Sequence, residues 1–101
     1  MKTIHKYPIQ ITDHQTISLP MGAKPLHVAR DPNGLPSLWA VVETDNPKED
    51  KDIYVVGTGN PMPESAKTHL GTFVINIHVW HVFIGDERPF RTKAADVEAG
   101  A

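Results

Sequence analysis

Proline and glycine divide this sequence into short segments. The chain holds nine prolines and seven glycines in 101 residues, and no stretch between them is longer than thirteen residues. Several of these stretches alternate apolar and polar residues or carry β-branched runs, a pattern typical of strands. We therefore predict an all-β fold, a small single-domain antiparallel sandwich or partly open barrel of six or seven strands.

Local signals place the individual strands. Pro8 cannot donate to a strand ladder, so the first strand is predicted at a sheet edge or with a bulge near Tyr7. Residues 31–34 form a strong turn signal, which predicts a hairpin between the segments on either side. Leu26 and Val28 are expected on one face, and the apolar segment 36–43 at the centre of a sheet. The expected strands cover residues 3–11, 16–19, 26–30, 36–43, 53–56 and 72–84.

Two segments are harder to interpret. Residues 45–50 are rich in acids and are predicted to be a mobile loop. Residues 72–84 are longer than a typical strand, and Asn76 is the expected place for a break. A continuous strand would instead place one set of side chains in the core, namely Phe73, Ile75, Ile77, Val79, His81 and Phe83.

Chain length indicates one domain. A chain this size buries only about 60–65% of the surface that its unfolded form exposes, so self-association would help it. We predict a β domain over residues 1–84 and a flexible tail over 85–101. No cysteine is present, which excludes disulfides and thiolate metal sites, and no apolar run is long enough to cross a membrane. We expect a cytoplasmic protein with no membrane partner.

The first third of the chain carries a net positive charge. Residues 1–30 hold four cations against the single acid Asp13, but the sequence pI is only about 6.3. This distribution argues against binding to long nucleic acids. A pocket for a small anion needs only two or three converging cations, and Lys6, Lys24 and Arg30 are the candidates.

Catalytic and metal-binding patterns are weak. His78 and His81 have metal-ligand spacing, but on a strand they would point to opposite faces, and no third ligand has a fixed spacing. No serine lies in a nucleophile elbow. Five of the twelve acids lie in or beside one predicted loop, which does not hold two acids apart in a cleft, namely Glu43, Asp45, Glu49, Asp50 and Asp52. We therefore expect no metal, no cofactor and no catalytic residue.

Residues 57–60 carry a second candidate site. Gly57-Thr58-Gly59 lacks the third glycine of a dinucleotide fingerprint. The two glycines fit either a turn with positive φ or a backbone that a ligand approaches closely, with Thr58 and Asn60 adding hydrogen bonds. Trp39, Trp80 and Tyr54 are either core residues or rings on which a base could stack.

A set of short segments occurs in a fixed order along the chain: Lys6-Tyr7-Pro8-Ile9, Ile11-Thr12-Asp13, Ile17, Leu19-Pro20, Gly22-Ala23-Lys24, Leu38-Trp39-Ala40-Val41-Val42, Val56-Gly57-Thr58-Gly59, Gly71-Thr72-Phe73 and Val79-Trp80-His81-Val82-Phe83. Together these segments resemble a family of short phage and prophage proteins that is carried as a domain of unknown function. The resemblance runs in order through residues 2–84, and it implies no catalytic residues, because the family has none agreed. The tail after residue 84 departs from it.

Small phage proteins of this kind often counter host defence, so by analogy the resemblance implies an accessory role. The first hypothesis is a non-enzymatic homo-oligomer that sequesters a nucleotide-derived signal. The alternative is a protein that binds and inhibits a host enzyme, and a third is a phosphodiesterase that uses His78 or His81. The ligand-binding residues expected for the first hypothesis are Lys6, Lys24, Arg30, Trp39, Gly57, Thr58, Gly59, Asn60 and Trp80.

Overall fold

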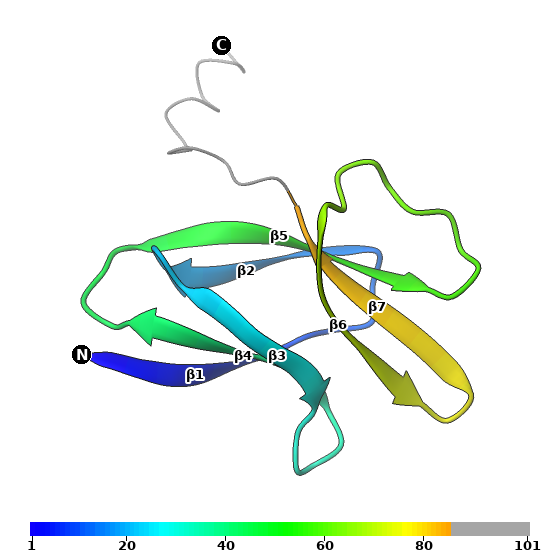
Figure 1. The fold of residues 1–101 in the computed structure, drawn as a ribbon, viewed down its shortest axis with the longest axis horizontal. Helices are drawn as coiled ribbons and strands as arrows, with labels where there is room; N and C mark the ends of the chain where they lie inside the picture. Colours follow the sequence, from blue (N-terminus) through cyan, green and yellow to red (C-terminus); the bar gives the residue numbers. More distant parts are fainter. Residues whose placement is uncertain (86–101) are drawn as a thin grey trace.

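A computed structural model describes residues 1–85 and contains seven strands in two antiparallel sheets (Figure 1). This confirms the all-β prediction, and because the sheets do not close into a barrel, the fold is a small sandwich. No helix occurs among residues 1–85, so none there could span a membrane. The strands are β1 (Lys2–Pro8), β2 (His14–Pro20), β3 (Lys24–Arg30), β4 (Pro36–Glu43), β5 (Lys48–Gly57), β6 (Thr68–Ile75) and β7 (His78–Ile84).

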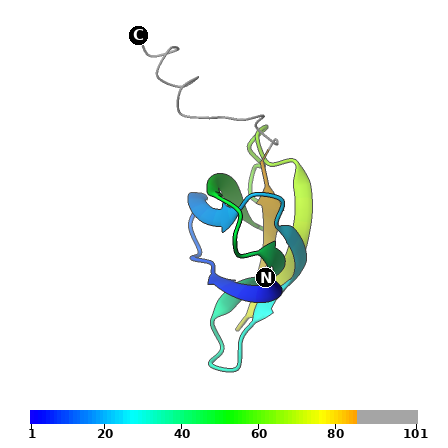
Figure 2. The same cartoon turned by 90° about the vertical axis from the view of Figure 1, so that its left-hand side faces the viewer.

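The strands divide unequally between the sheets. One sheet has the order β1-β4-β3 and the other the order β2-β5-β7-β6. β4 is the central strand of its sheet, as its apolar sequence predicted, and β1 is an edge strand, which accommodates Pro8. The chain changes sheet after β1, β2 and β4. Seen from the side, the molecule is narrow, as expected of two packed layers (Figure 2).

The core lies between the two sheets. Alternate residues of β4 and β5 are buried, and Leu38 of β4 shares the core cluster with Ile53 and Val55 of β5 in the other sheet. Burial of these side chains is the main source of stability for a domain of this size. The buried cluster consists of Ile9, Ile17, Leu19, Val28, Leu38, Ile53, Val55, Phe73 and Val82.

Both predicted turns are present. The β3–β4 hairpin turns over residues 31–34, where the Gly34 N–H donates to the Asp31 carbonyl at 2.7 Å and Gly34 has a φ of 83°. The break at Asn76 is confirmed, because this residue has a φ of 56° in the turn between β6 and β7. After that turn the inward face changes: Val82 is fully buried, whereas His81 and Phe83 lie on the outer face.

Two local predictions were wrong. The acidic segment is not a loop throughout, because β5 begins at Lys48, and Glu49 and Asp50 pair with Leu19 and Ser18 of β2. Pairing with β2 supplies backbone hydrogen bonds that outweigh the poor strand propensity of the acids. Leu26 is exposed, unlike Val28, because the register shifts between Pro25 and His27. Most of the predicted tail, residues 86–101, lies outside the described residues.

Candidate functional site

The nine predicted site residues fall into separate groups. Lys6 lies directly opposite Trp39 in the three-stranded sheet. Lys24 begins β3 and lines a cleft between the sheets, whereas Arg30 ends the same strand. At about 3.3 Å per residue, the two ends of this strand are roughly 20 Å apart. The remaining five residues, Gly57, Thr58, Gly59, Asn60 and Trp80, gather where β5 meets β7.

Lys6 already has a partner. Its ammonium lies 2.7 Å from Oδ2 of Asp31, a carboxylate whose side chain is only 3% exposed. Oδ1 of Asp31 accepts hydrogen bonds from the backbone N–H groups of Asn33 and Leu35. The Lys6 ammonium, and then the Leu35 N–H, hold the pKa of the Asp31 carboxyl below its ordinary value of 3.8. The Lys6–Asp31 ion pair therefore links edge strand β1 to the β3–β4 turn.

This pair predicts a specific acid sensitivity. Because the folded pKa of Asp31 is lowered, its contribution to stability is fully present above pH 3.8 and is lost as the pH falls through the lower folded value. Between about pH 5 and pH 2, the free energy of unfolding of the wild type should fall more steeply than that of Asp31→Asn. Urea unfolding across this range measures the difference. Asp13→Asn, at an exposed position, is the control and should keep the wild-type slope.

The turn after β5 is shaped by close packing around Gly57. A Cβ atom there would lie 2.9 Å from Nδ2 of Asn60 and 3.0 Å from Cζ3 of Trp80, so only glycine leaves room for both side chains. Gly59 has a φ of 91°, and the Asn60 N–H donates to the Gly57 carbonyl at 3.0 Å. Gly57 thus leaves room for the two side chains, Gly59 takes the positive φ of the turn, and Thr58 is exposed at its apex.

Thr58 begins a chain of hydrogen bonds on the outer face of the four-stranded sheet. Its Oγ1 lies 2.8 Å from Nε2 of His81, and Nδ1 of His81 lies 3.0 Å from Oγ1 of Thr72. The Thr72 hydroxyl is in turn 2.9 Å from Nε2 of His69. Each contact joins an imidazole nitrogen to a hydroxyl, which can either donate or accept, so the two threonines can satisfy either tautomer of His81. We call Thr58, His81, Thr72 and His69 the hydroxyl–imidazole chain.

Four aromatic rings cross the same face beside this chain. His14 of β2 is directly opposite Tyr54 of β5, Tyr54 is opposite Phe83 of β7, and Phe83 is opposite His69 of β6. The His14 and Tyr54 ring centroids are 5.0 Å apart, and those of His69 and Phe83 are 5.3 Å apart. His14 is further held by Asp52, whose Oδ1 lies 2.9 Å from Nε2. We call His14, Tyr54, Phe83 and His69 the ring row.

The ring row and the hydroxyl–imidazole chain share His69 and together form a surface with flat aromatic rings beside donors and acceptors. Sheet-face aromatics of this kind can stack on nucleobases, and hydroxyl and imidazole groups can hydrogen-bond a sugar or phosphate. Among residues 1–85, no three histidines or carboxylates are grouped to hold a metal ion. His78 and His81 point to opposite faces of β7, as strand alternation requires.

Sequence reasoning missed most of this surface. It named Thr58 and considered Tyr54 and His81, but His14, His69, Thr72 and Phe83 were not recognised as site residues. Alternation from the buried pair Ile53 and Val55 does place Tyr54 on the outer face. Nothing local, however, shows which residues of β2, β6 and β7 lie opposite it, because cross-strand register depends on the tertiary fold.

Comparison with known proteins identifies a family to which the sequence is similar. A family model described as a domain of unknown function, DUF7352, matches residues 1–91. No curated protein and no solved structure matches the chain significantly. The match covers the whole β sandwich, including every residue of the ring row and of the hydroxyl–imidazole chain.

Proposed function

The chain belongs to the DUF7352 family, a domain of unknown function, and from that premise we propose that it binds a nucleotide-derived signalling molecule without transforming it. The ligand occupies the outer face of the four-stranded sheet, in a homo-oligomer. The observation that carries this proposal is the ring row beside the hydroxyl–imidazole chain.

The ring row supports recognition of a base. Every nucleobase has a flat π-face, and stacking on an aromatic side chain contributes about 1–3 kcal/mol per base. Tyr54 and Phe83 are partly buried and lie directly opposite each other, so their rings are held in place before a ligand arrives. A surface that is already ordered loses less entropy on binding.

The hydroxyl–imidazole chain supports recognition of the sugar and phosphate groups. The hydroxyl groups of Thr58 and Thr72 each supply one donor and two acceptors, and His81 lies between them. The three cations expected to meet phosphates are not used in this proposal. Lys6 is paired with Asp31, Lys24 lines the cleft between the sheets, and Arg30 ends edge strand β3.

Affinity explains the need for an oligomer. Sequestering a signal requires roughly nanomolar binding, about −12 kcal/mol. One base stacked on an open sheet face contributes only a small part of this. Burying most of the ligand requires a second surface, and in this proposal a second copy of the chain covers the ring row. Binding and self-association are therefore expected to depend on each other.

Native mass spectrometry of the protein, alone and mixed with a panel of cyclic and linear nucleotides, tests the proposal. We expect an oligomer that gains whole nucleotide masses and leaves the nucleotide unchanged. A monomer with no adduct contradicts the proposal. Product masses would instead indicate an enzyme, with His81 as the first residue to replace.

The biological role that we propose is that of a phage accessory protein that counters host defence by removing the signal. Support for it comes from the resemblance to short phage and prophage proteins. Sequestering a signal also requires no catalytic residue. Co-expression of the protein with a nucleotide-signalling defence system should restore phage growth. A variant that has lost the nucleotide should not restore it.

An exposed apolar patch on the other sheet favours a second candidate, a protein that binds and inhibits a host enzyme. Ile4 of edge strand β1 is 55% exposed and lies opposite Val41, beside Lys2, in a shallow depression. An open edge with an apolar centre can accept a strand from a partner protein. This candidate gains support if the nucleotide panel gives no adduct and binding of a host protein is lost in Ile4→Glu.

A further inference from the structure

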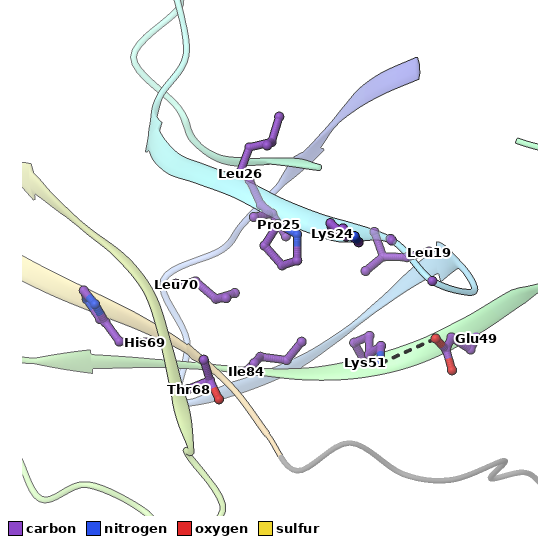
Figure 3. A pocket seen from close by; sticks show the side chains of 13 residues that line it. Leu19, Lys24, Pro25, Leu26, Glu49, Lys51, Thr68, His69, Leu70 and Ile84 are labelled. Carbon is purple, nitrogen blue, oxygen red and sulfur yellow. Dashed lines mark ion pairs between the residues drawn. The ribbon is translucent and has the colours of Figure 1, made fainter. Parts of the chain in front are cut away.

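A cleft opens between the two sheets, and His69 is the one residue that it shares with the ring row. It has a volume of about 600 Å³, which is within the range of small-molecule sites. Figure 3 shows Lys24 and Pro25 of β3 on one side and Leu70 and Ile84 on the other. Its residues are Leu19, Gly22, Ala23, Lys24, Pro25, Leu26, Leu38, Glu49, Lys51, Thr68, His69, Leu70 and Ile84.

The interior of the cleft is apolar because it reaches the core. Leu19 and Leu38 are almost completely buried, and both belong to the hydrophobic cluster between the sheets. Leu70 and Ile84 pack against that cluster while still lining the opening. A ligand that inserts an apolar body here would remove hydrocarbon surface from water on both sides.

The charges at the cleft limit which ligands fit. Glu49 and Lys51 neighbour each other on β5, with Oε2 and Nζ 3.4 Å apart and side chains only 25% and 14% exposed. Lys24 has no ion-pair partner within the described part of the chain. The lining lysines and glutamate therefore leave one net positive charge, which disfavours cations and suits one negative charge.

We propose that this cleft binds a small amphipathic monoanion, a carboxylate with an aliphatic body. The body lies among Leu19, Leu38, Leu70 and Ile84, and the carboxylate meets the Lys24 ammonium at the opening. Only His69 among the lining residues also belongs to the proposed nucleotide surface, and the proposal does not depend on nucleotide binding there. A few polar groups around an apolar cavity are the usual composition of a small-molecule site.

Titration of the full chain with decanoate, followed by calorimetry and by amide chemical shifts, tests the proposal. We expect saturable binding of one decanoate per chain, with the largest shifts at residues of β3 and at Leu70 and Ile84. Lys24→Glu should weaken binding by about tenfold or more, because it replaces attraction by repulsion. Leu70→Ala should weaken it by several-fold, because it removes part of the apolar wall.

Lys2→Glu is the matched control, since it reverses a charge on the three-stranded sheet and should leave binding unchanged. Thermal unfolding of both charge variants shows that each is folded. Three results would overturn the proposal: no saturation below the decanoate aggregation limit, equal affinity in Lys24→Glu and Lys2→Glu, or decanol binding as tightly as decanoate. None of these results bears on nucleotide binding.

Discussion

Gly71→Val is expected to unfold the domain or to lower its free energy of unfolding by about 3 kcal/mol or more. A Cβ at this position would lie 2.7 Å from Cβ of Val28 and 3.3 Å from the Val28 backbone nitrogen. Val28 is 1% exposed and belongs to the core cluster, so it cannot move aside without opening the core. At Gly71, β6 of one sheet lies so close to β3 of the other sheet that no side chain fits between them.

Urea unfolding of Gly71→Val beside Gly34→Ala measures this effect. Gly34 has a φ of 83°, but no heavy atom outside its chain neighbours lies within 4 Å of the place that a Cβ would take. Its substitution therefore carries backbone strain without a clash and should cost only about 1 kcal/mol. The difference between the two variants isolates the close approach of the sheets. Wild-type stability in Gly71→Val would show that the two strands are not held together as described.

The parts of the fold that sequence predicted depend on local chemistry. The β3–β4 turn follows from residues 31–34, and the β6–β7 turn from Asn76, whose side chain tolerates a left-handed backbone. The central position of β4 follows from an apolar run that would be costly to expose. In each case the residues that determine the structure are neighbours in the chain.

The features that the sequence did not reveal depend on partners distant in the chain. The sequence predicts Glu49 and Asp50 to be loop residues because β2, which pairs with them, lies about thirty residues earlier in the chain. The sequence also suggests that Lys6 is available to bind an anion, because its partner, Asp31, lies 25 residues later in the chain. The same limit applies to the candidate site, where Thr58 meets His81 across 23 residues. Alternation predicts the face of each side chain, but register between strands decides which side chains meet.

Tyr54→Leu and Phe83→Leu are expected to lower affinity for the nucleotide that gives an adduct by about tenfold each, and by roughly a hundredfold together. Leucine keeps most of the apolar bulk of each side chain, so the sheet should stay folded. It removes the flat π-face, and each lost stacking contact corresponds to about 1–3 kcal/mol. Calorimetric titration of the purified variants measures the change.

Trp39→Leu is the matched control for this pair of variants. The sequence predicted Trp39 as a ligand-binding residue, but its partly buried ring lies on the three-stranded sheet, opposite Lys6, and is not part of the nucleotide surface proposed here. If the ring row holds the base, Trp39→Leu should bind the nucleotide as tightly as the wild type does. In the double variant, adding the nucleotide should no longer stabilise the oligomer. Equal losses in all three variants would assign the effect to general destabilisation, and unchanged affinity in the double variant would remove the ring row from the site.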